Sequence, residues 1–91
     1  MEGAPSPPIT LGSLLSACSY KRAFNILYKR KYLNFKDSYV VLWDLRCQTA
    51  WRELQGLPSD SHVRDLLPGE TSSAPPCEVV ASLLDEFAQK R

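Results

Sequence analysis

The chain has 91 residues, of which 44% are hydrophobic, so it forms at most one small domain and is not disordered throughout. Its net charge of +1 hides a polarised distribution: residues 1–36 hold six basic residues against one acid, and residues 37–91 hold five against nine. Polarised charge of this kind indicates a partner of opposite charge.

The cysteine pattern bears on the cellular setting. Cys18, Cys47 and Cys77 are an odd number without a CxxC pair, and no secretory signal is readable at the N-terminus. We therefore predict a reduced, intracellular protein, nuclear or cytoplasmic, with mitochondrial import less favoured. The longest uncharged apolar stretch, Ile9 to Tyr20, is too short to span a bilayer.

The first part of the chain predicts an arm followed by a helix. Residues 1–9 are rich in proline and predict a flexible arm. From Leu11 to Leu57 there is no proline, which favours helix over a sheet with turns. A first helix is predicted over Leu11 to Leu33, with Thr10 as its N-cap. It carries two displaced apolar stripes, so it is either covered on two sides or broken near Ser19.

A second helix is predicted over Phe35 to Leu57, with a capping box formed by Asn34 and Asp37. One half of its helical wheel holds most of the apolar residues: Phe35, Tyr39, Leu42, Trp43, Cys47, Ala50, Trp51 and Leu54. Val41 and Leu45 fall on the polar half, so the pattern is imperfect. A β-strand over Ser38 to Leu45 is the alternative by residue propensity.

The rest of the chain predicts a linker or a long Pro/Ser-rich loop over residues 58–76 and a third helix, Glu78 to Lys90, within residues 77–91. The predicted fold is all-α: a helical hairpin over residues 10–57, with the third helix packed on it as a three-helix bundle or offered to a partner. A single helix from Leu11 to Gly56 is the alternative. The predicted core residues are Leu14, Phe24, Leu27, Tyr39, Leu42, Trp43, Trp51, Leu54, Leu83 and Phe87.

A repeated Tyr-Lys-Arg-x-aromatic pattern, at residues 20–24 and 28–32, marks the first helix. It contributes to a set of basic residues that we call the basic strip: Lys21, Arg22, Lys29, Arg30, Lys31 and Lys36. Such a strip fits an acidic protein surface or nucleic-acid phosphates. The alternatives are a solvated helix face, or ion pairs within the chain to the acids Glu78, Asp85 and Glu86. Tyr28 to Lys31 also fits a nuclear import signal.

The apolar faces of the helices predict docking to a protein partner. Residues 11–15 (LGSLL) resemble the LxxLL helix through which coactivators bind nuclear receptors. The predicted partner-binding residues are Leu11, Leu14, Leu15, Trp43, Trp51, Val80, Leu83, Leu84 and Phe87.

Enzymatic function is not predicted. His62 is the single histidine and lies beside Ser59, Asp60 and Ser61, but adjacency in sequence does not create a catalytic geometry. The cysteines lack metal-ligand spacing, and no glycine-rich phosphate loop is present. We therefore expect a non-enzymatic adaptor or small subunit of a larger complex, without a cofactor, and a small nucleic-acid-binding protein as the alternative.

Overall fold

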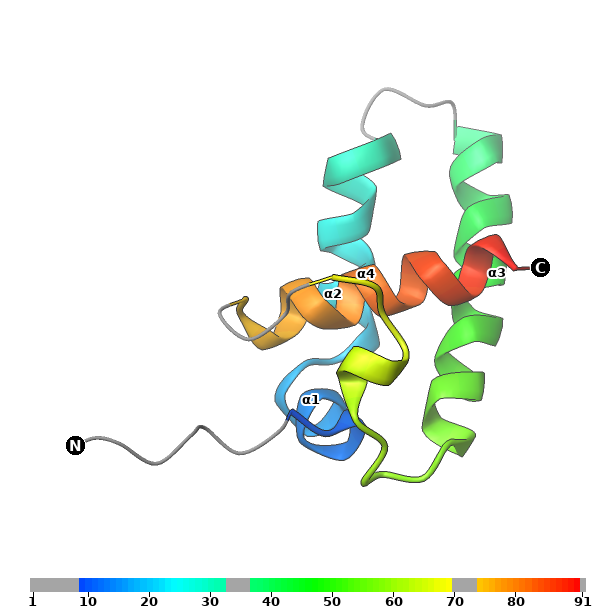
Figure 1. The fold of residues 1–91 in the computed structure, drawn as a ribbon. Coiled ribbons are helices and arrows are strands. Elements are labelled where there is room, and N and C mark those ends of the chain that lie inside the picture. Colours follow the sequence, from blue (N-terminus) through cyan, green and yellow to red (C-terminus); the bar gives the residue numbers. More distant parts are fainter. Residues whose placement is uncertain (1–8, 33–36, 70–73, 91) are drawn as a thin grey trace.

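A computed structural model describes residues 9–32, 37–69 and 74–90, and these ranges are helices joined by turns (Figure 1). The elements are α1 (Leu11–Ala17), α2 (Tyr20–Leu27), the π-helical turn η1 (Tyr28–Tyr32), α3 (Asp37–Gly56), the 3₁₀ turn η2 (Val63–Asp65) and α4 (Pro76–Gln89). The predicted all-α class is confirmed for the described residues. None of their helices has the length and apolar character needed to cross a membrane.

Helix α4 lies at the centre, and α1, α2 and α3 all pack against it (Figure 1). It begins at Pro76, at a position where proline is well tolerated. Its buried side chains point in most directions around the axis: Val79, Val80, Ala81, Leu83, Leu84 and Ala88. A helix that is apolar on most sides belongs in the interior. Of the two arrangements considered for this helix, the structure has the one in which it packs on the rest of the chain.

The predicted first helix is broken, at the place where its two apolar stripes diverge. Thr10 caps α1 by accepting a hydrogen bond from the Ser13 amide, as predicted, and Ser19 caps α2 by accepting from the Arg22 amide. Cys18, between them, has an extended backbone. The single helix from Leu11 to Gly56 is therefore wrong. The cap predicted at Asn34 lies outside the described residues.

Helix α3 confirms the second predicted helix, but its buried side differs from the predicted one. The buried residues Trp43, Cys47, Ala50 and Leu54 follow helical spacing and face the core. Two predicted core residues are wrong, because Tyr39 and Leu42 are 49% and 63% exposed. Both residues lie on the same side of the buried stripe, Tyr39 about 20° and Leu42 about 80° from its edge at Ala50.

The segment after α3 is an ordered connection over residues 58–69. The Leu11 amide donates to the Ser61 carbonyl at 2.9 Å, and the Val63 amide donates to the Ile9 carbonyl at 3.1 Å. Val63 is fully buried, and Leu67 is nearly so. Residues 58–69, the first part of the predicted linker or loop, therefore form a segment that is hydrogen-bonded to the start of α1. Residues 70–73, and residues 1–8 of the arm predicted over residues 1–9, lie outside the described residues.

Gly12 allows this close approach. Its amide donates to the Ser59 carbonyl at 2.8 Å. A Cβ atom at position 12 would lie 2.8 Å from the Ser59 Cβ atom, which is shorter than real contacts of this kind. Glycine is therefore required here by the neighbouring backbone, even though it weakens the helix.

Cys18 and Cys77 form a disulfide, with Cα atoms 5.2 Å apart. The bond joins the break between α1 and α2 to the first turn of α4. Cys47 is free and buried. The expectation that all three cysteines are reduced is therefore wrong for Cys18 and Cys77. Sequence spacing does not reveal the pair, because the two residues are separated by 59 positions and meet only in the folded chain.

Candidate functional site: the charged and apolar surface

Five residues of the basic strip lie on α2 and η1, and all five are exposed: Lys21, Arg22, Lys29, Arg30 and Lys31. Lys21 and Arg22 belong to α2, whereas Lys29, Arg30 and Lys31 belong to η1. Lys36 lies outside the described residues. The structure thus places the described part of the strip at the surface and divides it into two groups, which differ in their partners.

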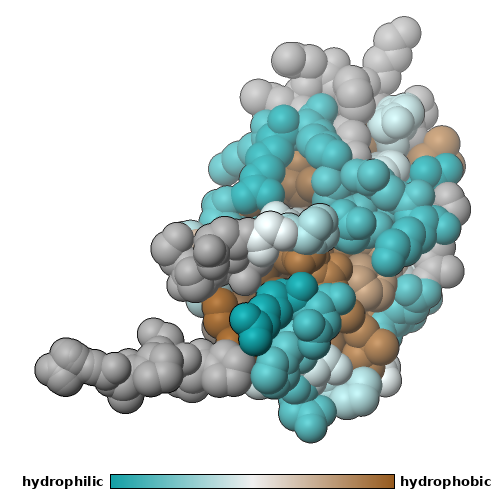
Figure 2. All heavy atoms as spheres, viewed as in Figure 1, coloured by the Kyte–Doolittle hydropathy of each residue, from teal (hydrophilic) through white to brown (hydrophobic). Residues whose placement is uncertain are grey.

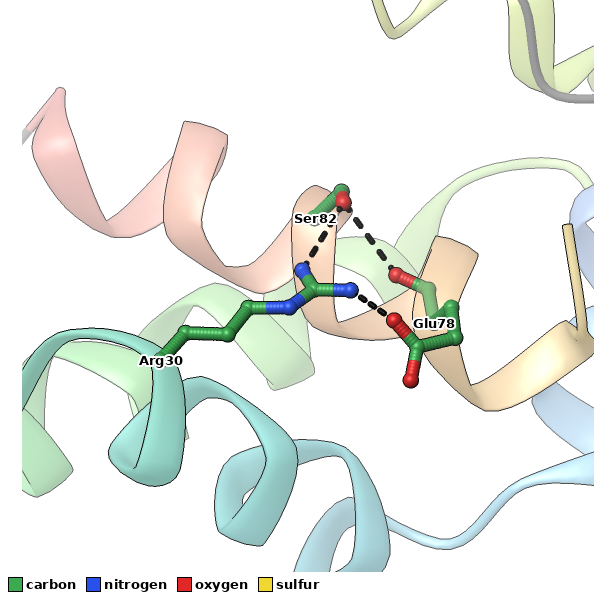
Figure 3. A network of polar contacts seen from close by, with 3 residues as sticks. All are labelled: Arg30, Glu78 and Ser82. Atoms are coloured by element: carbon green, nitrogen blue, oxygen red, sulfur yellow. Dashed lines mark hydrogen bonds and ion pairs between the residues drawn. The ribbon is translucent and has the colours of Figure 1, made fainter.

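Arg30 and Lys31 are paired with acids of α4, as one of the alternatives for the basic strip predicts. The Arg30 guanidinium contacts the Glu78 carboxylate through Nη2 and donates from Nη1 to the Ser82 hydroxyl at 3.4 Å (Figure 3). Ser82 in turn donates to the Glu78 carbonyl at 3.1 Å. Lys31 Nζ lies 2.7 Å from Asp85 Oδ2. Part of the positive charge of the first third of the chain is therefore used internally.

The same network borders a pocket with a volume of about 290 Å³. Its lining residues are Arg30, Leu67, Ala74, Pro75, Glu78, Val79 and Ser82. Arg30 is the one basic group in this lining, and Glu78 neutralises it. The pocket therefore offers no net charge with which to select an anionic ligand.

Lys21, Arg22 and Lys29 form the second group. No ion pair of these three residues exists within the described ranges, and their side chains extend into solvent. They are the part of the basic strip that remains available to an external acidic partner.

The residues predicted to bind a partner through apolar helix faces lie in or against the core. Six of them are buried: Leu11, Leu14, Trp43, Val80, Leu83 and Leu84. The other three are partly buried and pack against these: Leu15, Trp51 and Phe87. Contacts within the chain therefore account for the apolar pattern of these residues. This includes the leucines of the LxxLL-like stretch, of which Leu11 and Leu14 are buried and Leu15 is partly buried.

The apolar residues that do face solvent lie on α3. Val41, Leu42 and Leu45 are 59%, 63% and 56% exposed, and we call them the outer apolar patch. Figure 2 shows brown spheres at the upper right edge of the molecule, where α3 lies, in addition to a larger brown area at the centre of this face. Sequence reasoning missed this patch as a candidate site. The signal was present, because Val41 and Leu45 fall on the polar half of the predicted helical wheel.

A hydrogen bond and ring contacts fix α2 against α3 beside this patch. The Tyr20 hydroxyl donates to Asp44 Oδ1 at 2.5 Å, and its ring meets the Trp51 ring edge-on at 5.7 Å. Burial, followed by the interaction with Asp44, raises the pKa of Tyr20 above its usual range. Burial also raises the pKa of the Cys47 thiol to about 12, and the charge of Asp44 acts in the same direction. Both groups are held in their neutral forms, which suits packing rather than acid-base chemistry.

The described residues contain no group of three or more His, Cys, Asp or Glu side chains that could hold a metal ion. His62 is exposed, and its backbone forms an isolated antiparallel bridge with Thr10. The backbone bridge to Thr10 therefore fixes the position of His62 within the connection between α3 and α4.

Comparisons with protein-family models, with curated proteins and with solved structures found no match to this chain. The fold and surface described above define a small all-α protein with an internal disulfide, a basic face on α2 and an exposed apolar patch on α3.

Proposed function

We propose that this protein is a non-enzymatic adaptor or small subunit of a larger complex, which docks a protein partner through the outer apolar patch of α3. The observation that carries the proposal is the exposure of Val41, Leu42 and Leu45 side by side on one helix. Contiguous exposed apolar residues are a feature of interaction surfaces. The free bases Lys21, Arg22 and Lys29 would steer and orient an acidic partner.

The proposal differs from the sequence-based one in its docking residues. The apolar residues first predicted to bind a partner stabilise the core instead. A partner that docks on α3 leaves this core intact, so binding does not require the chain to open. The surface offered is small, which fits a subunit that also uses its basic face.

A small nucleic-acid-binding protein is the second candidate, supported by the exposure of Lys21, Arg22 and Lys29 without internal ion pairs. Three phosphate contacts would give a plot of log affinity against log salt concentration with a slope of about −2 to −3. The pairing of Arg30 and Lys31 with α4 reduces the number of bases available for this function.

The intracellular setting belongs to the proposal and has a testable consequence. Thiols stay reduced in the cytosol and nucleus, so Cys18 and Cys77 would be dithiols there, whereas an oxidising compartment would preserve the disulfide. Alkylation of free thiols in intact cells, followed by mass spectrometry, measures the fraction of each state.

The test of the proposed function is a quantitative pull-down of tagged protein from cell extract, with and without nuclease. The variants are Leu42→Asp/Leu45→Asp, which puts charge into the patch, and Lys21→Glu/Arg22→Glu/Lys29→Glu, which reverses the free bases. Gln55→Glu, on an exposed position of α3 outside the patch, is the matched control. All three should fold, because the changed side chains are exposed.

A near-stoichiometric protein that survives nuclease and is lost with the patch variant supports the adaptor. Partners that vanish with nuclease and with the charge-reversal variant instead support the nucleic-acid candidate. A partner retained by both variants would contradict both candidates.

A further inference from the structure

We infer that the outer apolar patch of α3 binds an amphipathic helix whose apolar stripe is flanked by carboxylates. This inference rests on the proposed function and specifies the chemistry of the partner. It depends on the arrangement of charged side chains around the patch and on the backbone of α3.

The patch has the shape of a helix-packing surface. Leu42 lies three residues before Leu45, and Val41 lies four before it, so the three side chains share one side of α3. This side is separate from the buried stripe that contains Cys47 and Leu54. Side chains spaced in this way form a ridge that fits between the side chains of another helix.

The charges on the same side of α3 select for acid. Arg46 follows Leu42 by one turn, and Arg52 follows Leu45 by two turns, so both lie beside or in line with the patch. Both arginines are exposed, and neither forms an ion pair within the described ranges. The Arg46 guanidinium lies over the Trp43 ring, 5.5 Å from its centroid, which restricts its motion before a partner arrives.

The acids nearby are already engaged. Asp44 accepts hydrogen bonds from the Tyr20 hydroxyl and from the Gln48 amide group. Glu53 also has an interaction within this chain. Arg46 and Arg52 are thus the exposed basic groups beside the patch that have no ion pair among the described residues, and the complement of their charge is a carboxylate.

The backbone of α3 excludes recognition by strand addition. Strand addition needs an exposed sheet edge with unpaired amide and carbonyl groups. The patch lies within a continuous helix, whose interior backbone groups are paired within the helix. The partner must therefore contact side chains, and a helix presents apolar and acidic side chains at the spacing of α3 itself.

A second copy of this chain is a poor occupant of the patch. In a symmetric pair, residues near the two-fold axis meet their own copies. An axis through the patch would bring Arg46, next to Leu45, close to Arg46 of the other copy.

The arrangement sets a spacing for the partner. The distance along α3 from Leu45 to Arg52 is about 10.5 Å, which is two helical turns. An antiparallel or parallel helix would therefore place a carboxylate about two turns from its apolar residues.

The test is selection of helical 18-residue peptides from a randomised displayed library, with the intact oxidised protein as bait. The selected peptides are then measured by fluorescence anisotropy. We expect them to combine an apolar stripe at helical spacing with Asp or Glu about two turns away. Leu45→Asp should weaken their binding about 30-fold, and Arg46→Glu/Arg52→Glu about 10-fold. Gln55→Glu is the control and should leave binding unchanged.

A charge exchange makes the test specific. A peptide in which the acids are replaced by lysine should lose binding to the wild-type protein and regain it with Arg46→Glu/Arg52→Glu. Recovery of no peptide, of basic peptides, or of peptides insensitive to Leu45→Asp would overturn the inference. So would a dimer in light scattering that Leu45→Asp dissociates, because that result assigns the patch to a second copy.

The inference and the proposed function fail separately. If the pull-down finds a protein partner that requires the patch while the selected peptides are not acidic, docking stands and the partner chemistry is wrong. If the pull-down finds no protein partner dependent on the patch, the proposed function itself fails, whatever peptides are selected.

Discussion

Helices α4 and α3 both carry apolar residues on more than one side, but only α4 is covered on those sides. Three helices surround α4, and its side chains Val80, Leu83 and Leu84 are fully buried. Helix α3 is covered on one side, and its outer leucines remain in water. A helix with apolar residues on more than one side can bury the additional side in two ways. Other helices of the same chain cover it, as in α4, or a separate partner covers it, as we propose for α3.

The charges of the two helices follow the same division. The acids Glu78 and Asp85 of α4 turn toward Arg30 and Lys31 of η1. The arginines of α3, Arg46 and Arg52, are instead exposed and form no ion pair within the described residues. Part of the positive charge of the first third of the chain is therefore neutralised by ion pairs with α4. Basic residues without such pairs are exposed on α2, η1 and α3.

The largest expected effect on stability comes from breaking the disulfide that links α4 to the break between α1 and α2. The Cys18–Cys77 bond closes a loop with a sequence separation of 59, which restricts the unfolded chain. Reduction, or Cys77→Ser, should lower the free energy of unfolding by about 4 kcal/mol. Urea unfolding with and without a phosphine reductant measures this loss.

The matched control for that experiment is the reductant on Cys77→Ser, which should have no further effect because Cys47 has no partner to lose. Equal midpoints for the oxidised and reduced wild-type protein would show that α4 is held by packing alone.

Two leucine-to-alanine changes sharpen the comparison directly. Leu83→Ala, in α4, removes a fully buried side chain and should destabilise the protein by about 3 kcal/mol. Leu45→Ala, in α3, changes a side chain that is 56% exposed and should alter stability by less than about 0.5 kcal/mol. Thermal unfolding of the two variants side by side gives the answer. Similar losses for both would mean that the α3 side chain is covered in solution, for instance by a second copy.

Local signals in the sequence predict much of this fold. Apolar periodicity indicates the helices, and Thr10 and Pro76 mark the starts of α1 and α4. The acids of the third predicted helix also indicate the ion pairs with Arg30 and Lys31. These features depend on residues a few positions apart or on simple charge complementarity.

The features that sequence reasoning missed depend on distant contacts. Cys18 and Cys77 pair only because α4 packs at the break between α1 and α2. The segment around Ser61 is ordered because its carbonyl accepts from the Leu11 amide. A helical wheel predicts Leu42 in the core because it shows only which residues share a side of the helix. It does not show how many neighbouring helices pack against α3, and that number decides which apolar side is buried.

A smaller loss of stability is expected at alkaline pH, because Cys47 and Tyr20 are neutral in the folded protein and lose their protons more readily in the unfolded chain. The unfolded chain releases the Cys47 proton near pH 9, whereas the folded protein holds it until about pH 12. Stability is thus fully present below pH 9 and falls above it, by up to about 1.4 kcal/mol for each pH unit. Tyr20, whose pKa is also raised, adds to the fall above pH 10.

Urea unfolding between pH 8 and pH 10.5 measures this slope, with the disulfide verified by mass. Cys47→Ala is the matched variant: it should be less stable than the wild-type protein at pH 8, where the thiol is neutral in both states, and should show a shallower decline between pH 9 and pH 10. An identical slope in the variant and the wild-type protein would assign the decline to other groups.

The smallest effects should come from the ion pairs between η1 and α4, and their difference tests how far α4 is enclosed. The side chains of Arg30 and Glu78 are 40% and 39% exposed, so a double-mutant cycle with Arg30→Gln and Glu78→Gln should give a coupling of about 0.5 kcal/mol. The pair of Lys31 with Asp85 should couple more strongly, near 1 kcal/mol, because the Asp85 side chain is only 19% exposed and less screened. Repeating both cycles in 1 M salt should abolish the first coupling and only reduce the second. If the Arg30–Glu78 pair instead shows the stronger coupling, Asp85 is more exposed to water in solution than in the structure. In that case only the apolar side chains of α4 are shielded from solvent, and its charged residues are not.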